Sequence, residues 1–434
     1  MLSDEKTSTL INQTMSRKKL WTIIVLLVLL NPLTSGQKSI VESFKMSARQ
    51  INITPEEPVM MSGYSNRKTP STGVHDSLYA SALYFTGNKR QMLLITTDLI
   101  GFSSSLVDEV KSSINSLTGI PVENILITAV HNHGGPSVRV YENTPSDATD
   151  RYISMVKEKL GKLSVSAARN PVPFKMGIGN GSCFLNINRR ALFANGYIGL
   201  GRDQEKPCDH ELVVAKFEDM NSKLIAVMIN WPCHGTASGQ DNYLISGDWP
   251  GAAARYIKDE VGKNVVVAVT AGASADINPI YGPGVNFNEI NAVGYNVAKE
   301  TTGLLRGIYT IPVKDIQAVY TTIKFPGKQR GTDNKPPVSF ESGPEVELRI
   351  SGLKIGDLVM EGISGELMTE FGMQVKESSP YRNTIILTHC NGSSGYICTD
   401  QSYKEGGYEI MTTRMMPGIE KPLVSKFLEV IRSF

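Results

Sequence analysis

The chain has 434 residues, of which 41% are hydrophobic and 20% are charged, so it can bury a full core and has room for two or three domains on length alone. Its formal net charge is only +2, and no basic block interleaved with aromatic residues occurs after residue 40. Charge therefore indicates no attraction to an anionic membrane, and we expect no nucleic acid among the partners. Residues 38–434 are expected to form one domain, because no part of them resembles an independent second domain.

The N-terminal residues predict a secretory signal peptide within residues 1–37. Basic residues at 17–19 precede an apolar run at 20–30, and small residues follow that run. The alternative is a membrane anchor, although the run is short for a helix that must cross about 30 Å of hydrocarbon. Met15 is a second candidate start, which would leave residues 1–14 as an upstream extension. We expect an exported protein, periplasmic or extracellular, without a stable membrane span in the mature chain.

A strand–helix–strand unit follows in chain order. Residues 91–98 and 124–130 are apolar, strand-like runs, and residues 104–117 repeat apolar side chains at helical spacing. This unit implies two parallel strands, and ligands bind beyond the carboxyl ends of strands in open α/β sheets. His131 and His133 follow the second strand and precede a Gly-Gly-Pro turn that lets backbone approach a ligand closely.

Strands and helices continue to alternate along the chain. The further predicted elements are a hairpin at 211–217 and 223–231, a helix at 251–261, strands at 264–270 and 357–363, a helix to about residue 378, a strand at 383–389 and a closing amphipathic helix at 423–434. His234, Glu366 and Tyr396 each come after one of these strands. The segment 324–337 is rich in Lys, Gly, Arg and Pro and predicts an exposed loop or a lid.

Four residues after strand ends could meet around one metal ion, namely His131, His234, Glu366 and Tyr396. Nitrogen and oxygen ligands of this kind suit a zinc ion that activates water in a hydrolase. Each residue also has a purely structural explanation, since buried histidines are often held by hydrogen bonds, a glutamate at a helix start is stabilised by the helix dipole, and tyrosine is an infrequent ligand.

Other titratable residues receive different roles. We interpret His75, His210 and His389 as structural or surface histidines, and Asp98 and Asp248 as partners that orient histidine ligands.

The five cysteines are an odd number for an exported protein and form no CxxC motif. At most two disulfides can form, and the sequence alone assigns no pairing. Cys233 is a weak candidate for a nucleophile, because catalytic Cys–His pairs join residues across a fold and not neighbours in sequence.

Six short elements occur in the order that one known family shows. They are GYSNR with GVHDSLYASAL at 63–83, TAVHNHGGP at 128–136, LNINRR at 185–190, CHGTAS with ISGDWPG at 233–251, TAGASADINP at 270–279, and GYICTDQSYKEGGYE at 395–409. Over roughly residues 45–420 the chain resembles the neutral, non-lysosomal ceramidase family, specifically its amino-terminal catalytic domain. The resemblance implies an α/β fold, a single catalytic domain with mixed β-sheets flanked by helices.

The resemblance also implies roles for single residues. It implies a zinc ion held by His131, His234, Glu366 and Tyr396. His133 would lie beside the metal and, together with Tyr408 and Arg189, would contact the scissile carbonyl group. Zinc would lower the pKa of bound water, while tyrosine and histidine donors would stabilise the oxyanion and protonate the leaving amine.

Two departures from the family pattern bear on the substrate. Asn278 stands where the family carries serine, and an amide can donate a hydrogen bond but cannot form an acyl intermediate. Attack by zinc-bound hydroxide is then the simplest mechanism. Full-length family members continue into an immunoglobulin-like domain, whereas about 26 residues follow Tyr408 here.

We therefore expect an exported zinc hydrolase that cleaves an amide of N-acylsphingosine or a related lipid-like compound. Two alternatives stay open. One is a zinc hydrolase of an ester or a glycan-linked substrate, and the other is a non-catalytic binding homologue that lost turnover when Asn278 replaced serine.

Overall fold

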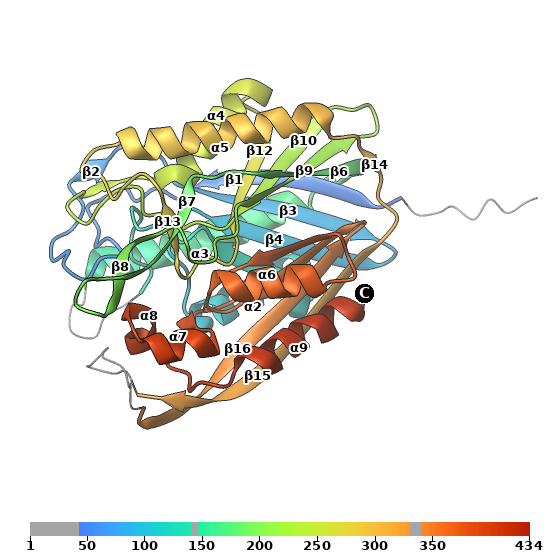
Figure 1. Cartoon of the computed structure of the whole chain (residues 1–434). Coiled ribbons are helices and arrows are strands. Elements are labelled where there is room, and N and C mark those ends of the chain that lie inside the picture. Colours follow the sequence, from blue (N-terminus) through green and yellow to red (C-terminus); the bar gives the residue numbers. More distant parts are fainter. Residues whose placement is uncertain (1–42, 140–145, 330–339) are drawn as a thin grey trace, which may run out of the picture. The chain divides into compact units, whose positions relative to one another are not determined.

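The computed structural model describes residues 43–139, 146–329 and 340–434, which belong to one compact unit, Ser43–Phe434. Mixed β-sheets flanked by helices make up this unit (Figure 1), which confirms the expected fold class. The predicted signal peptide at 1–37 lies outside the described residues. Within the described ranges, the helices are all too short or too polar to cross a membrane.

The largest sheet has nine strands. Its order is β12 (Val266–Ala271), β10 (Leu224–Trp231), β9 (Glu211–Asp219), β6 (Val172–Ser182), β1 (Lys45–Asn52), β3 (Tyr79–Gly87), β4 (Arg90–Thr97) and β5 (Ile125–Ala129), with β14 (Ile311–Pro312) paired to β6. The β4–β5 and β10–β12 pairs are parallel. Strands β1 and β6 pair only through Lys45 with Pro173 and Met46 with Val172, so the two halves of the sheet are joined by a short ladder.

A second sheet has four strands, in the order β15 (Ile316–Lys328), β16 (Ser342–Ile355), β17 (Leu358–Ile363) and β19 (Asn383–Leu387). Its β17–β19 pair is parallel. Smaller ladders join β13 (Ile277–Pro279), β7 (Asn186–Leu192) and β8 (Ile198–Asp203), then β11 (Leu244–Ile245) and β2 (Gly73–Val74), and finally β18 (Glu366–Leu367) and β20 (Tyr396–Ile397).

Helices cover the outer faces of these sheets. Apolar side chains of α2 (Ser104–Thr118) and α3 (Asp147–Ala168) pack on β3, β4 and β5. Those of α4 (Asp248–Val261) and α5 (Asn288–Gly307) pack on β9, β10 and β12. Those of α6 (Thr369–Ser378) and α9 (Glu420–Arg432) pack on the four-stranded sheet. The short elements are η1 (Val122–Asn124), α7 (Asp400–Glu405) and α8 (Tyr408–Thr412).

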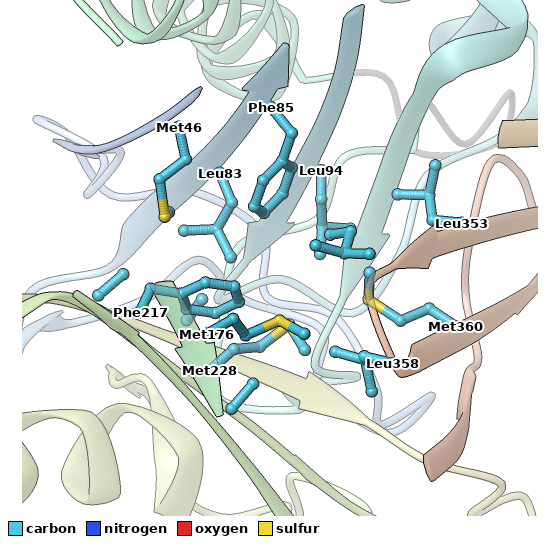
Figure 2. Close-up of a cluster of buried hydrophobic side chains, with 14 of the residues drawn as sticks. Met46, Leu83, Phe85, Leu94, Met176, Phe217, Met228, Leu353, Leu358 and Met360 are labelled. Atoms are coloured by element: carbon cyan, nitrogen blue, oxygen red, sulfur yellow. The ribbon is translucent and has the colours of Figure 1, made fainter. Parts of the chain in front are cut away.

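A buried core lies between the sheets (Figure 2). Phe85 of β3 and Phe217 of β9 come from opposite halves of the large sheet, and their ring centroids are 5.8 Å apart. Met360 of β17 brings the four-stranded sheet into the same cluster. Both faces of the central strands are therefore buried, which explains why their sequences are continuous apolar runs and not alternating ones.

Most predicted elements occur close to their expected positions. The parallel β4–β5 pair around α2 and the β9–β10 hairpin are confirmed, and the closing helix is α9, which buries Leu423 and Phe427. The prediction of a loop over 324–337 is wrong for its first part, because Lys324–Lys328 belongs to β15 and pairs with β16. Pro326 and Gly327 are typical of turns, which concealed the end of this strand in the sequence. Residues 330–339 lie outside the described residues.

Candidate metal centre

The ends of separate strands bring the four candidate ligands together. His131 follows β5, His234 follows β10, Glu366 follows β17, and Tyr396 begins β20. The backbone N–H of His133 donates to the carbonyl of Gly235 at 2.9 Å, which ties the loop after β5 to the loop after β10. Glu366 pairs with Tyr396 in the β18–β20 ladder. Backbone hydrogen bonds therefore hold residues far apart in sequence around one point.

The ring of His131 is oriented by a backbone carbonyl. Its Nδ1 lies 2.9 Å from the carbonyl oxygen of Ile100. Because a carbonyl can only accept, Nδ1 carries the proton and Nε2 keeps its lone pair. The residue has φ of +57°, and the side-chain amide of Asn132 supports this turn by donating to the carbonyls of Asp98 at 3.0 Å and Ser246 at 2.7 Å.

His234 is oriented in the same way. Its Nδ1 lies 2.6 Å from the carbonyl oxygen of Ser274 and 3.1 Å from that of Ile277, and its side chain is fully buried. Its Nε2 therefore also carries a lone pair. Two imidazoles thus present metal-binding nitrogens that the backbone holds in place.

The prediction that Asp98 and Asp248 orient the histidine ligands is wrong. The Asp98 carboxylate accepts from the backbone N–H of Tyr79 at 2.8 Å, and burial raises its pKa to about 7. The Asp248 carboxylate accepts from the backbone N–H groups of Ala237 and Ser238. Both carboxylates stabilise loops next to the centre. Backbone carbonyls, and not these carboxylates, orient the imidazole rings of His131 and His234.

Glu366 faces both imidazoles. Its Oε2 lies 3.4 Å from Nε2 of His131 and 3.7 Å from Nε2 of His234. Tetrahedral ligands at about 2.0–2.1 Å from a zinc ion are roughly 3.3–3.4 Å apart, so these separations leave room for such an ion. The same oxygen is buried without a hydrogen-bond partner, which is costly unless a cation occupies the space.

The protonation states suit a divalent cation. Burial lowers the pKa of His131 and lowers that of His234 well below its ordinary value, and Arg189 lowers the latter further. Burial alone would raise the pKa of Glu366, but its interactions with His131, His389 and the Arg189 guanidinium hold it below its ordinary value. Neutral imidazoles and an ionised carboxylate are the forms that metal binding needs.

His133 lies beside these ligands. Its Nε2 is 3.3 Å from Nε2 of His131, and its buried Nδ1 has no hydrogen-bond partner. The ring nitrogens of His131, His133 and His234 lie within 4.8 Å of one another, so the geometry also permits His133 as a ligand. Gly63 has φ of +91°, and a Cβ there would come within 2.4 Å of the His133 ring, so glycine is required at this position.

Arg189 links the metal ligands to a buried carboxylate. Its Nη2 donates to the Tyr396 hydroxyl at 3.2 Å, and its Nε donates to Oε1 of Glu409 at 2.8 Å. Tyr396 also hydrogen-bonds the Glu366 carboxylate. Burial, with Glu366 adding to the effect, raises the pKa of Tyr396 well above its ordinary value. Without a cation nearby, the Tyr396 phenol is therefore protonated, and a bound cation would favour its phenolate form.

A cavity of about 740 Å³ opens over this centre. Its wall includes the four residues predicted to be catalytic, which are His133, Arg189, Asn278 and Tyr408. The Tyr396 and Tyr408 rings meet edge to face at 5.8 Å, and Arg189 makes a long hydrogen bond of 3.5 Å to Oδ1 of Asn278. The structure thus places all four beside the candidate ligands, while their catalytic roles stay predictions.

His389, interpreted from the sequence as a structural or surface histidine, also lies at this centre. Its buried ring stacks on that of His131 with centroids 3.9 Å apart and an angle of 9°. One ring nitrogen lies within 4.8 Å of candidate ligand atoms of His131 and Glu366. His389 comes two residues after the end of β19, the same kind of position that pointed to the other histidines, so strand-end placement was the signal that could have found it.

The five cysteines are all free thiols, so none of the disulfides that the sequence allowed occurs in the structure. Cys233, next to His234, is fully buried, and burial raises its pKa well above its ordinary value. A nucleophilic thiolate at this position is therefore disfavoured.

Residues 48–283, more than half of the chain, match the family model for neutral/alkaline non-lysosomal ceramidase, N-terminal. The chain is 25% identical to a neutral ceramidase of Oryza sativa subsp. japonica over 272 residues, which cover 60% of this chain and 34% of that protein. It is 24% identical to a neutral ceramidase of Mycobacterium tuberculosis over 221 residues, which cover 46% and 33%. The chain therefore spans about a third of the length of these relatives.

Among solved structures, the fold is similar to that of neutral ceramidase from Pseudomonas aeruginosa. The TM-score is 0.74 at 17% identity, over 90% of this chain and 74% of that chain. At this identity the likeness concerns the fold. The family match includes His131, His133, Arg189, His234 and Asn278, and Glu366, Tyr396 and Tyr408 lie after its end.

Proposed function

We propose that this chain, which belongs to the neutral/alkaline non-lysosomal ceramidase family, is a zinc-dependent hydrolase that cleaves an amide of the N-acylsphingosine type. The observation that carries the proposal is the unpaired Oε2 of Glu366, 3.4 Å and 3.7 Å from the oriented Nε2 atoms of His131 and His234. Family membership supports a hydrolase, and the names of its relatives support an amide like ceramide. The exact substrate belongs to the proposal, because the chain matches only part of those relatives.

We assign the zinc ion to His131, His234, Glu366 and Tyr396. A zinc ion bound there would activate water near neutral pH and polarise a carbonyl group. The protein supplies the orientation: backbone carbonyls fix both imidazoles, and Arg189 holds the Tyr396 hydroxyl at 3.2 Å. Such fixed partners keep a ligand set in place without reorganisation during the reaction.

Other residues of the cavity wall would handle protons and charge. His133 is neutral at pH 7, because burial and the neighbouring histidines lower its pKa well below its ordinary value. It can accept a proton from water and deliver one to the leaving amine. Arg189, already fixed by Glu409, would stabilise an oxygen that gains negative charge, and the hydroxyl of Tyr408 would donate to the same oxygen. Asn278 would position the substrate through its amide.

We also propose that the protein is exported, with its signal peptide removed near residue 37. The support is the order of basic, apolar and small residues at 17–37. Fractionation of cells that express the full chain, followed by mass spectrometry of the protein's N-terminus, tests this. Retention in the cytoplasm with an intact N-terminus would contradict it.

Metal content and hydrolysis together test the proposed function. The purified protein is expected to hold one zinc per chain by elemental mass spectrometry and to release fatty acid from a short-chain ceramide. His234→Ala should lose both the zinc and the activity. His210→Ala is the matched control, because His210 is half-buried and outside the candidate ligand groups.

The outcomes separate the parts of the proposal. Equal zinc content in wild type, His234→Ala and His210→Ala would overturn the ligand assignment. A zinc-loaded protein that cleaves esters but neither ceramide nor simple N-acyl amides would overturn the amide assignment and favour hydrolysis of a different bond.

A further inference from the structure

The wall of the cavity above the metal centre combines apolar surface with many polar side chains. Small-molecule sites are mostly lined by apolar and aromatic side chains with only a few polar groups. Here the lining includes the hydroxyl and amide residues Ser65, Asn66, Thr236 and Gln240, in addition to tyrosines and two arginines. Among the described residues, no aspartate or glutamate lines this cavity. The wall therefore suits a substrate with both apolar and polar parts and disfavours a positively charged one.

The two arginines of the wall differ in their charge partners. Arg189 is buried, and its Nε lies 2.8 Å from Oε1 of Glu409, which compensates its charge. Arg202 has no carboxylate within ion-pair distance among the described residues. Arg202 therefore carries the uncompensated positive charge of this cavity, and an anionic group of a ligand is the natural complement to it.

Arg202 is also fixed in position. It lies in β8, next to the lining residues Leu200 and Gly201, and its Nη2 donates to the carbonyl of Gly282 in the loop that follows β13. This hydrogen bond joins two walls of the cavity. A guanidinium has five N–H donors, so one contact with a carbonyl leaves donors for a carboxylate or a phosphate.

We propose that, among amides that the site accepts, it prefers one that carries an anionic oxygen group, and that Arg202 binds this group at the mouth of the cavity. The inference rests on the proposed function for the bond that is cleaved, but it concerns a separate residue. A carboxylate and a phosphate share the required chemistry. Arg202 would determine specificity, while the metal centre performs the reaction.

Two matched pairs of amides test the inference on the zinc-loaded full-length protein. N-octanoylglycine and N-octanoylglycinamide differ by a carboxylate, and N-octanoylethanolamine phosphate and N-octanoylethanolamine differ by a phosphate. Binding is measured by calorimetry, and turnover is measured as octanoate release. We expect the charged member of at least one pair to bind about tenfold tighter or more. Arg202→Gln should remove the preference of the site for the charged member, whereas Arg306→Gln, on the exposed end of α5, should preserve it.

The pattern of results distinguishes this inference from the proposed function. Hydrolysis of charged and neutral members at equal rates, with equal affinities, would overturn the role of Arg202 and leave the amidase intact. Preferential binding of a charged member without any octanoate release would support the role of Arg202 and count against amide hydrolysis. A preference that survives in Arg202→Gln would overturn the inference, because another group would then be responsible.

Discussion

The metal centre and the mouth of the cavity are built in different ways. In the centre, His234 is fully buried, and backbone carbonyls fix its ring. At the mouth, Leu200 is 54% exposed and lies on the short strand β8. We therefore expect strand ends in the packed core to fix the chemistry and the small β7–β8 hairpin to determine substrate choice. Changes in the centre should abolish the reaction, whereas changes at the mouth should only alter which substrate is used.

The largest effect that keeps the metal in place is expected from His133→Ala. Loss of a proton-transfer group should lower turnover by roughly 10²–10⁴-fold while the zinc content stays at the wild-type level. His75→Ala, whose ring stacks on Phe287 away from the centre, is the control and should retain activity. Loss of zinc from the His133 variant would instead show that His133 is a ligand, which the geometry also permits.

Glu409→Gln tests whether the centre depends on its buried charge balance. Glu409 accepts from both Arg189 and Arg190 at 2.8 Å and is 1% exposed, so the variant leaves buried Arg189 without its carboxylate and Arg190 with Glu405 alone. The free energy of unfolding should fall by about 3–5 kcal/mol in chemical denaturation. Glu57→Gln, which breaks a solvent-exposed ion pair with Arg151, should leave the free energy of unfolding nearly unchanged. Similar small effects from both variants would contradict the contrast between interior and surface.

Asp98→Asn tests how the buried carboxyl group of Asp98 makes stability depend on pH. The pKa of Asp98 is about 7 in the folded protein and about 3.9 in an unfolded chain, so the folded state holds the extra proton between these values. The wild type therefore loses stability as pH rises through that window, by about 1.4 kcal/mol per pH unit, and the variant lacks this term.

Unfolding free energies at pH 5, 6 and 7 measure the effect. The difference between Asp98→Asn and wild type should shift in favour of the variant as pH rises. Asp147→Asn, at the exposed start of α3, is the matched control for the loss of a carboxyl group. A constant difference for Asp98→Asn would mean that the carboxylate is already ionised at pH 5.

A smaller effect is expected from His389→Ala. Its ring stacks on His131 at 3.9 Å, so its loss should loosen a ligand without removing one. Zinc affinity, measured by competition with a chelator, should fall by about 10–100-fold, the usual range for residues that support a ligand. Affinity as low as in His234→Ala would identify His389 as a ligand, and unchanged affinity would assign it to packing alone.

The smallest kinetic effect is expected from a substitution at the mouth of the cavity. Leu200→Ala removes part of the cavity wall, so KM should rise roughly two- to tenfold with kcat unchanged. Leu192→Ala, at the exposed outer end of the same hairpin, is the matched control and should leave both constants unchanged. A large fall in kcat for Leu200→Ala would contradict the division between centre and mouth.

Strand ends were visible in the sequence because apolar runs stop abruptly before polar side chains. That pattern located His131 and His234, and the parallel strand pairs confirm why such residues converge. The carbonyl acceptors of Ile100 and Ser274 left no signature, since any residue type supplies a carbonyl, and Asp98 was given their role instead. The mouth of the cavity could not be predicted from the sequence, because the β7–β8 hairpin is short and its exposed residues show no clean alternation of apolar and polar side chains.

X-ray absorption at the zinc edge tests the central claim most directly. The account predicts a bound zinc ion with about four nitrogen and oxygen ligands at about 2.0–2.1 Å, including the scattering pattern of two imidazoles. The same spectrum from His234→Ala should show that this site is lost. A sulfur shell near about 2.3 Å, or a fully loaded site that is unchanged in His234→Ala, would contradict the assignment of the metal to His131, His234, Glu366 and Tyr396.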